Sequence, residues 1–352
     1  MAVIELLADS ESDAWDKFVL GHNQGSIYHT SQWQRIIGTT YGLHPLYIVL
    51  KGEGRDILGG LPLFCVKNIF GSKSITSLPC AQSCNPLFDK QADYDEALRY
   101  IRYLSNYYGC RYAELRTTAG GELVTTSYTK VTQKYSTYIL DLGRPLDVIK
   151  RSFHKSCVQR PIEKAYRSGL ELIEGRTEED LRKFYSLYVG MRKDHGLLPQ
   201  PFSFFHTMWK ELKKSGHMDV FLAKFSGKVI SSILLLKFKQ KVTYEYGASM
   251  PGALGVKPSH FLIWEAIKRS AMSGYKMFDF GRTSDDDIGL SQFKSRWGTK
   301  REALIYYLIH DKARALPARE SSFARKLMQV VVGKSPDWLC RRAGEILYKY
   351  LV

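Results

Sequence analysis

Three β-rich runs in the second half of the chain follow one another almost without interruption. They cover residues 219–225, 228–238 and 241–248, and only two residues separate each run from the next. Breaks this short join antiparallel neighbours, because a parallel connection needs a dozen or more residues. The sequence therefore predicts a meander of three antiparallel strands.

The meander is followed by a regular succession of further elements. A helix is predicted to open at Pro258, because proline suits the first helical position, and to end at Gly274. Its apolar residues recur at near-helical spacing. A strand at 276–281, a short helix at 290–297 and a strand at 303–309 are expected next.

The first half contains a weaker copy of this order of elements. Its predicted strands are 44–50, 56–66 and 74–79, then a helix at 94–108 and a strand at 113–117. The repeat lies in the order of elements and not in sequence identity. Between the halves, residues 146–168 carry helical signals, and Pro161 should either kink one helix or begin a second.

The length of 352 residues exceeds what one hydrophobic core usually supports, and 44% hydrophobic residues suffice for two cores. We therefore expect a domain at 1–144, a domain at 145–312 and a helical tail at 313–352. The formal net charge of +16 favours a polyanionic partner: RNA, an anionic membrane surface or a phosphate-rich substrate.

The start of the chain has no basic segment followed by a long apolar stretch, so we expect no signal peptide. The apolar-rich stretch 230–236 is far shorter than the roughly 20 residues of a membrane-spanning helix. The expected location is the cytoplasm, with peripheral contact at the inner face of the membrane as an option. Of six cysteines, only Cys80 and Cys84 are closely spaced, so no metal site is expected.

The strongest motif lies near the end of the second half. Residues 278–284 are Phe-Asp-Phe-Gly-Arg-Thr-Ser, and residues 293–298 are Phe-Lys-Ser-Arg-Trp-Gly. Together with Lys257-Pro258-Ser259 and the stretch 192–205, this segment resembles the Fem family of transferases, which build peptidoglycan cross-bridges. The resemblance covers most of residues 155–310, and the stretch Tyr28–Trp33 resembles the family's first domain.

The resemblance implies an α/β (α+β) protein with two tandem acetyltransferase-like (GNAT-like) domains, each a mixed, mainly antiparallel sheet flanked by helices. It implies transfer of an aminoacyl or acyl group to an amine of a cell-envelope precursor that carries phosphates. No tightly bound cofactor is expected, and the donor is aminoacyl-tRNA or acyl-CoA. A long charged helical arm for transfer RNA is not visible, and the loop 252–257 lacks the full acetyl-CoA pattern.

Two alternative functions stay open. One is a CoA-dependent N-acyltransferase that acts on an amino sugar in polysaccharide synthesis. The other is a non-catalytic module that binds polyanions, for which the excess of basic residues would suffice.

Acyl transfer to an amine requires stabilisation of the oxyanion that forms on the carbonyl. The resemblance assigns this role to Lys294, and Trp297 would anchor a short helix that directs the ammonium into a cleft. Without the surrounding motif, Lys294 would be an ordinary surface lysine. Phe293 indicates core packing, and by resemblance it also shapes the substrate channel.

Two carboxylates are candidate general bases. Asp279 alternates with two phenylalanines, so its side chain should face away from their rings, and a simple pair with Arg282 is the alternative. Glu245 lies on the third strand of the meander, from which GNAT enzymes often supply a base. A solvated strand face is its alternative.

A basic stripe is predicted at the start of the second half. Arg160, Lys164 and Arg167 recur at helical spacing and could hold phosphates of a nucleotide-sugar or a lipid pyrophosphate. A solvated helix face is the alternative. By family analogy, Arg35 contributes to the same phosphate site. The predicted substrate-binding set is completed by Arg282, Phe293, Tyr246 and Lys257.

The spacing of residues shows no Ser-His-Asp set and no Walker loop. Asp194-His195-Gly196 is interpreted as a structural loop. The tail at 321–352 has apolar residues on one helical face before and after Pro336, interspersed with arginines and lysines. It could lie on an anionic membrane, or it could cover the core of its own domain.

Overall fold

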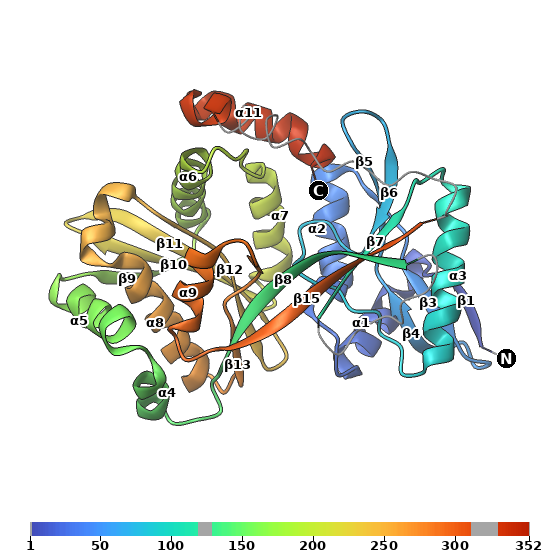
Figure 1. Cartoon of the computed structure of the whole chain (residues 1–352), viewed down its shortest axis with the longest axis horizontal. Helices are drawn as coiled ribbons and strands as arrows, with labels where there is room; N and C mark the ends of the chain where they lie inside the picture. Colours follow the sequence, from blue (N-terminus) through green and yellow to red (C-terminus); the bar gives the residue numbers. More distant parts are fainter. Residues whose placement is uncertain (1, 119–128, 311–329, 352) are drawn as a thin grey trace. The chain divides into compact units, whose positions relative to one another are not determined.

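The computed structural model describes residues 2–118, 129–310 and 330–351, which form two compact units (Figure 1). The first unit contains the described residues up to Ser136 and the strand segment that starts at Glu302. The second contains Thr137–Arg301 and the C-terminal helix. The chain passes from one unit to the other within β8 (Thr129–Asp141) and returns within β15 (Lys300–Ile309). The expected domain limits remain a prediction.

The first unit has two sheets, with strand orders β1-β3-β4 and β2-β5-β6-β7-β15-β8. Its elements are β1 (Val3–Leu6), α1 (Ser12–Gly21), α2 (Ser31–Tyr41), β2 (His44–Pro45), β3 (Ile48–Lys51), β4 (Ile57–Leu61), β5 (Phe64–Lys67), β6 (Lys73–Thr76), α3 (Gln91–Tyr107) and β7 (Ala113–Thr118). The single strands expected at 44–50 and 56–66 are wrong, because each is two strands. Pro62 has no amide proton for a ladder hydrogen bond, and it separates β4 from β5.

The second unit has the strand order β8-β13-β12-β11-β10-β9, and β14 pairs with β8. Its elements are α4 (Leu146–Ser152), η3 (Lys155–Gln159), α5 (Arg160–Arg167), β9 (Glu171–Glu174), α6 (Glu178–Asp194), α7 (Phe202–Leu212), β10 (Met218–Phe225), β11 (Lys228–Phe238), β12 (Lys241–Ser249), η4 (Pro251–Val256), α8 (Pro258–Met272), β13 (Met277–Asp279), β14 (Thr283–Ser284), α9 (Ile288–Ser295) and α11 (Asp337–Leu347). These mixed, mainly antiparallel sheets with flanking helices confirm the predicted class.

The predicted meander is confirmed as β10, β11 and β12, paired antiparallel in sequence order. Helix α6 covers one face of these strands and α8 covers the other (Figure 1). Both faces of β11 are therefore excluded from water, and every residue from Ile230 to Leu236 is buried. This burial explains why Ile and Leu predominate in this stretch, which also contains the buried Ser231 and Ser232.

Strands β12 and β13 are parallel neighbours over only three residue pairs, from Lys241–Met277 to Thr243–Asp279. Beyond them, β12 carries a bulge at Glu245, because Leu234 lies opposite Tyr246 while Leu235 lies opposite Tyr244. A bulge bends a strand and redirects its side chains. After Thr243, β12 thus no longer pairs with β13 as a regular parallel strand would.

A second helical segment does follow α4, but it begins at Lys155 as the π-helix η3 and continues directly into α5, so Pro161 lies inside it and not at its start. Helix α4 ends at Ser152, and α5 starts at Arg160 with Pro161 in its first turn. Strand β8 was not predicted, because its polar residues give no clean alternation. Helix α6 was also missed, although its capping box of Thr177 and Asp180 is a sequence signal.

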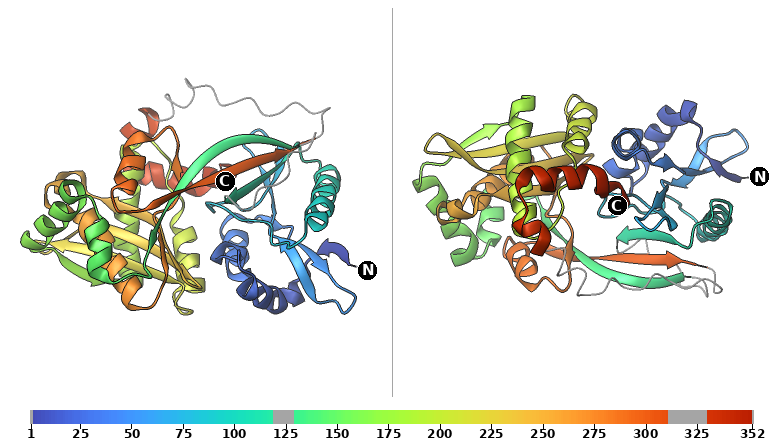
Figure 2. Two further views of the ribbon diagram at one scale, coloured as in Figure 1. Left: turned by 60° about the horizontal axis from the view of Figure 1, so that its bottom comes forward. Right: turned by 90° about the horizontal axis from the view of Figure 1, so that it is seen from above.

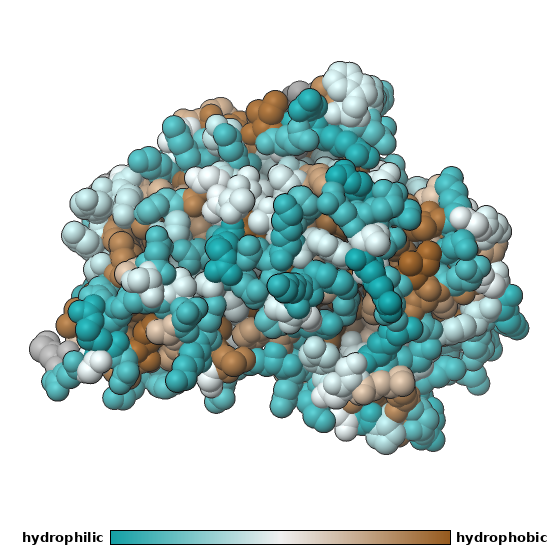
Figure 3. All heavy atoms as spheres, turned by 180° about the vertical axis from the view of Figure 1, so that it is seen from behind, coloured by the Kyte–Doolittle hydropathy of each residue, from teal (hydrophilic) through white to brown (hydrophobic). Residues whose placement is uncertain are grey.

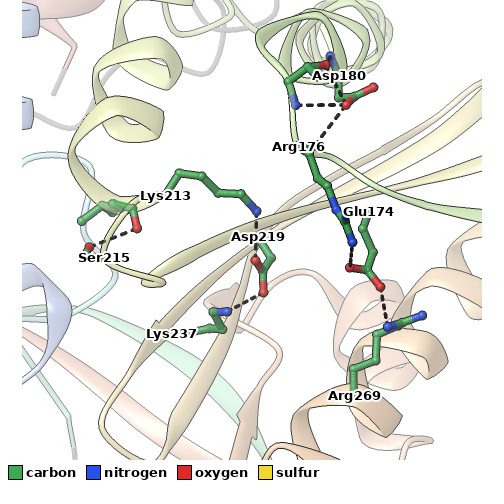
Figure 4. Close-up of polar contacts among 10 residues, drawn as sticks. Glu174, Arg176, Asp180, Lys213, Ser215, Asp219, Lys237 and Arg269 are labelled. Carbon is green, nitrogen blue, oxygen red and sulfur yellow. Dashed lines mark hydrogen bonds and ion pairs between the residues drawn. The ribbon is translucent and has the colours of Figure 1, made fainter.

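Ion pairs connect the elements around the outer strands (Figure 4). Asp219 on β10 pairs with Lys213 at 3.2 Å and with Lys237 of β11 at 2.6 Å. Glu174 at the end of β9 pairs with Arg269 of α8 at 2.5 Å. These partly exposed pairs add modestly to stability and help to fix the strand order.

Helix α11 packs on α6 within the second unit (Figure 2). The contact uses small residues, since Cys340 and Gly344 are buried and Leu198 and Val332 close the cluster around Cys340. Lys193 of α6 pairs with Asp337 at 3.0 Å. The part of the predicted tail face at 321–329 lies outside the described residues. None of the helices in the described part has the length and apolar character that a membrane crossing demands.

We predict that Gly344→Ala loosens α11, because the added methyl group would overlap the backbone carbonyl of Pro199. Overpacking against a backbone that cannot yield costs about 1–3 kcal/mol. Hydrogen exchange of the amides at 337–347 should accelerate. The control is Gly255→Ala, whose methyl group would meet nothing within 4 Å. Equal protection of α11 in both variants would contradict the packing described here.

Candidate functional site

Trp297 fixes the position of the motif that follows β13. Its side chain is fully buried and contacts the rings of Phe153 at 5.2 Å, Phe280 at 5.7 Å and His260 at 5.7 Å between centroids. Helix α9 ends two residues earlier, and Asp287 caps its start by accepting a hydrogen bond from the Leu290 amide at 2.9 Å. The expectation that Trp297 anchors a short helix is consistent with this packing.

Lys294 lies on the inner side of α9 and is only 4% exposed. Its ammonium donates hydrogen bonds to the carbonyl oxygens of Gly281 at 2.7 Å and Arg282 at 3.2 Å. Burial lowers the pKa of Lys294 to about 8, and the negative charges of Asp279, Glu245 and Asp287 oppose this shift. The surface-lysine alternative is therefore wrong: Lys294 is a buried, oriented amine.

Asp279 is the last residue of β13 and is buried. Its carboxylate accepts hydrogen bonds from the Thr137 hydroxyl and, at 2.8 Å, from the Gly281 amide. Lys241 lies 3.6 Å away as an ion-pair partner. Gly281 has a φ of 77°, a left-handed conformation that glycine adopts without strain and that lets the chain turn back toward α9. Asp279 thus organises the loop whose carbonyls hold Lys294.

The tyrosines on either side of Glu245 have different surroundings. Tyr246 packs edge-on against Tyr188 at 5.7 Å and Phe205 at 5.2 Å, so its ring serves the core between the sheet and α6. Tyr244 folds over Gly247, where an added methyl group would overlap the phenol. Burial raises the pKa of Tyr244 to about 12, which keeps its hydroxyl neutral.

Tyr244 is also part of the wall of a cavity of about 330 Å³. Three serine hydroxyls run along this cavity, with Ser231 2.7 Å from Ser249, and Ser249 3.0 Å from Ser259. Asp194 and His195 also line this cavity. Asp194 ends α6 and His195 and Gly196 form the turn after it, so their interpretation as a structural loop stays a prediction. No sequence pattern indicated the cavity beside Tyr244, because the bulge in β12 lies next to this residue.

His260 is another residue that sequence reasoning missed. Its Nε2 lies 3.1 Å from the carbonyl oxygen of Cys157, and its ring stacks on Trp297. Burial lowers the pKa of His260. Phe293 lies edge-on to the same imidazole at 5.5 Å and is part of this aromatic cluster. No sequence spacing indicated the cluster, because its members come from four separate segments.

The remaining predicted residues are not all in one place. Arg160, Lys164 and Arg167 are exposed on α5, as a single helical stripe requires. Arg282 is exposed directly after Gly281, and Lys257 has a φ of 61° at the start of α8. Arg35 belongs to the first unit, where it donates a hydrogen bond to Ser31 at 3.1 Å. In the described ranges, no group of three or more His, Cys, Asp and Glu side chains could hold a metal ion.

Comparison with known proteins supports the prediction that the second unit is a GNAT-like domain. Residues 153–295 match the family described as acetyltransferase (GNAT) domain. The UDP-N-acetylmuramoylpentapeptide-lysine N(6)-alanyltransferase of Weissella viridescens is 28% identical over 138 residues, which is 38% of this chain and 39% of that protein. The lipid II:glycine glycyltransferase of Staphylococcus haemolyticus (strain JCSC1435) is 33% identical over 97 residues, or 26% of this chain and 23% of that protein. The matched part thus spans less than two fifths of these curated relatives.

Solved structures extend the similarity of fold to both units. The crystal structure of FemX has a TM-score of 0.66 at 16% identity and covers 86% of this chain and 96% of its own. A tandem GNAT protein from the clavulanic acid biosynthesis pathway has a TM-score of 0.58 at 11% identity, over 91% of this chain and all of its own. The predicted relationship is confirmed: the homologues are Fem-family transferases, and the fold is that of tandem GNAT proteins.

We predict that the amine of Lys294 titrates near pH 8. A ¹⁵N-lysine NMR titration should show a resonance with this midpoint that is absent in Lys294→Met. Because the folded pKa lies below the unfolded value, protonation of this group opposes folding, and its own contribution to the free energy of unfolding should rise between about pH 8 and pH 10.5, measured as the difference between the unmodified protein and Lys294→Met. A midpoint above 10 would contradict the burial.

Proposed function

We propose that this protein is an acyltransferase that moves an aminoacyl or other acyl group to an amine of a cell-envelope precursor. The observation that carries the proposal is Lys294, a buried ammonium held by the carbonyls of Gly281 and Arg282. A fixed cation in a water-poor site stabilises negative charge far more than an exposed one does. The relatives named above are transferases of alanine and glycine, which favours the same class of reaction.

In the proposed reaction, a neutral amine attacks the carbonyl carbon of an activated ester or thioester. The carbonyl π electrons move to oxygen, and Lys294 stabilises that oxyanion. The oxyanion then collapses, the bond to the leaving oxygen or sulfur breaks, and an amide remains. A carboxylate must accept the proton of the amine, and it passes this proton to the leaving group. Glu245 and Asp279 are the candidates, since both contribute negative charge at Lys294.

The proposed donor is an aminoacyl-tRNA, since the curated relatives are named as transferases of alanine and glycine, and an acyl-CoA is the second candidate. The match to an acetyltransferase domain favours the latter, with an amino sugar as the acceptor. Mass spectrometry of ligands retained by the purified protein tests the choice: transfer RNA or a nucleotide-sugar peptide supports the first, and CoA or an acyl-CoA supports the second.

We predict that Lys294→Ala lowers kcat about 100-fold to 1000-fold in an assay with the matched donor, the usual effect of losing one oxyanion-stabilising group. The substitution also leaves two carbonyl oxygens without their donor, so circular dichroism and thermal melting must accompany the assay. The matched control is Lys300→Ala, which removes an exposed lysine beyond α9.

Full activity of a folded Lys294→Ala variant would overturn the role of Lys294. If neither the unmodified protein nor Lys294→Ala catalyses transfer with any donor and acceptor tested, the non-catalytic alternative is supported instead. In that alternative, the net charge of +16 binds polyanions.

Helix α11 supports a proposed peripheral contact with the membrane. Opposite its packed face, Trp338 is 66% and Ile346 62% exposed, and Leu339 is exposed beside them. Arg342 and Lys334 are exposed nearby. Small groups of hydrophobic residues interrupt the mostly hydrophilic surface in Figure 3, one of them at the upper edge where α11 lies. A tryptophan, an arginine and a lysine around an apolar face suit the interface of an anionic bilayer.

We predict that the double substitution Trp338→Ser and Ile346→Ser reduces binding to vesicles that contain phosphatidylglycerol by roughly tenfold, because two apolar side chains no longer leave water. High salt should weaken binding of the unmodified protein. The control is Met272→Ser, which removes a side chain that is 77% exposed on α8. Absence of vesicle binding by the unmodified protein would refute the membrane contact.

A further inference from the structure

Two thiols of the first unit lie side by side although they are 45 positions apart in the sequence. The Sγ atoms of Cys65 and Cys110 are 3.7 Å from each other, about 1.7 Å more than the length of a disulfide bond. Cys65 belongs to β5, and Cys110 follows the end of α3. Sequence spacing did not indicate this pair, because only Cys80 and Cys84 are close along the chain.

Strand β6 holds the backbone on both sides of the pair. Cys65 lies directly opposite Ile75 in the antiparallel ladder of β5 and β6. At the other edge of β6, the amide of Arg111 donates a hydrogen bond to the carbonyl oxygen of Lys73 at 2.9 Å, and this contact fixes the residue next to Cys110. Because both segments are attached to the same strand, a small movement of the two side chains brings the sulfurs to bonding distance.

The two thiols differ in exposure and in charge. Cys65 is partly exposed, whereas Cys110 is fully buried. The hydrogen bond with Cys110 lowers the pKa of Cys65 to about 7, burial opposes this shift, and the positive charge of Lys73 supports it. The thiolate is the form that reacts with oxidants. Cys65 is therefore the thiol that an oxidant reaches first, and Cys110 lies beside the product of that reaction.

We propose that Cys65 and Cys110 form a reversible redox site, at which hydrogen peroxide converts the two thiols into a disulfide. The Cys65 thiolate attacks one peroxide oxygen, the O–O bond breaks and hydroxide leaves, so that Cys65 becomes a sulfenic acid. The Cys110 sulfur then attacks the sulfenic sulfur, the S–S bond forms and the S–O bond breaks. The departing hydroxide takes the Cys110 proton and leaves as water. The two thiols lose two electrons in total, and the peroxide is reduced to two waters.

The disulfide connects β5 to the segment after α3 within the first unit. It also protects Cys65, because a sulfenic acid that condenses with a neighbouring thiol is not oxidised further to the irreversible sulfinic acid. Lys294 and the loop that holds it belong to the second unit. The redox site therefore does not depend on the proposed acyl transfer.

Mass spectrometry of the full chain tests the proposal, after treatment with hydrogen peroxide and alkylation with iodoacetamide in urea. We expect the number of alkylated cysteines to fall by two from six, and a pair of peptides joined through Cys65 and Cys110 to appear. Dithiothreitol should restore all six thiols. The control is Cys157→Ser, which removes another partly exposed thiol and should form the same link to the same extent.

Two variants separate the steps of the reaction. In Cys110→Ala the sulfenic acid has no thiol to condense with, so Cys65 should persist in that form and react with dimedone. In Cys65→Ser the link should be absent and the buried Cys110 should remain a thiol. Thermal melting shows whether each variant is folded, and alanine at 110 adds no buried unpaired hydroxyl.

Three results would overturn the proposal. One is six alkylated cysteines in the unmodified protein at a peroxide dose that oxidises Cys157. Another is a link between other cysteines in place of this one. The third is oxidation of Cys65 to a sulfinic acid while Cys110 is still alkylated.

Discussion

The burial of Trp297 is the contact on which the candidate site depends. A short helix such as α9 has little stability of its own, so its position must come from tertiary packing. The rings of Phe153, Phe280 and His260 surround the indole and hold the end of α9 against the core of the second unit. Lys294, one turn earlier, is thereby buried, and the carbonyls of Gly281 and Arg282 compensate for the water that its ammonium loses.

The same unit combines a rigid sheet with a local departure from regular pairing. Strand β11 is covered on both faces and gives the sheet a fixed centre. Strand β12 pairs with β13 over three residue pairs and then bulges at Glu245. The bulge separates two aromatic residues that ordinary alternation would treat alike: Tyr246 fills the core, and Tyr244 borders a cavity. Without the bulge, Tyr244 and Tyr246 would point to the same face of β12.

Small residues determine what two helices of this unit leave accessible. On α11, Cys340 and Gly344 allow close packing, so the large apolar residues remain on the outside. On α6, Ser186 and Gly190 leave a hollow beside the serine-lined cavity. In both cases, the absence of a bulky side chain at one position decides which neighbouring side chains remain accessible at the surface.

The sequence by itself determined the meander, the helix that starts at Pro258 and the motif around Lys294, because turn residues, proline geometry and apolar spacing act over short distances. It also indicated the relatives. Only the tertiary structure decided that Lys294 is buried, that Asp279 accepts hydrogen bonds from Thr137 and Gly281, and that Ser232 and Tyr244 line a common cavity. These facts join residues up to 142 positions apart, and burial, pKa and strand bulges depend on such distant neighbours, which no local pattern contains.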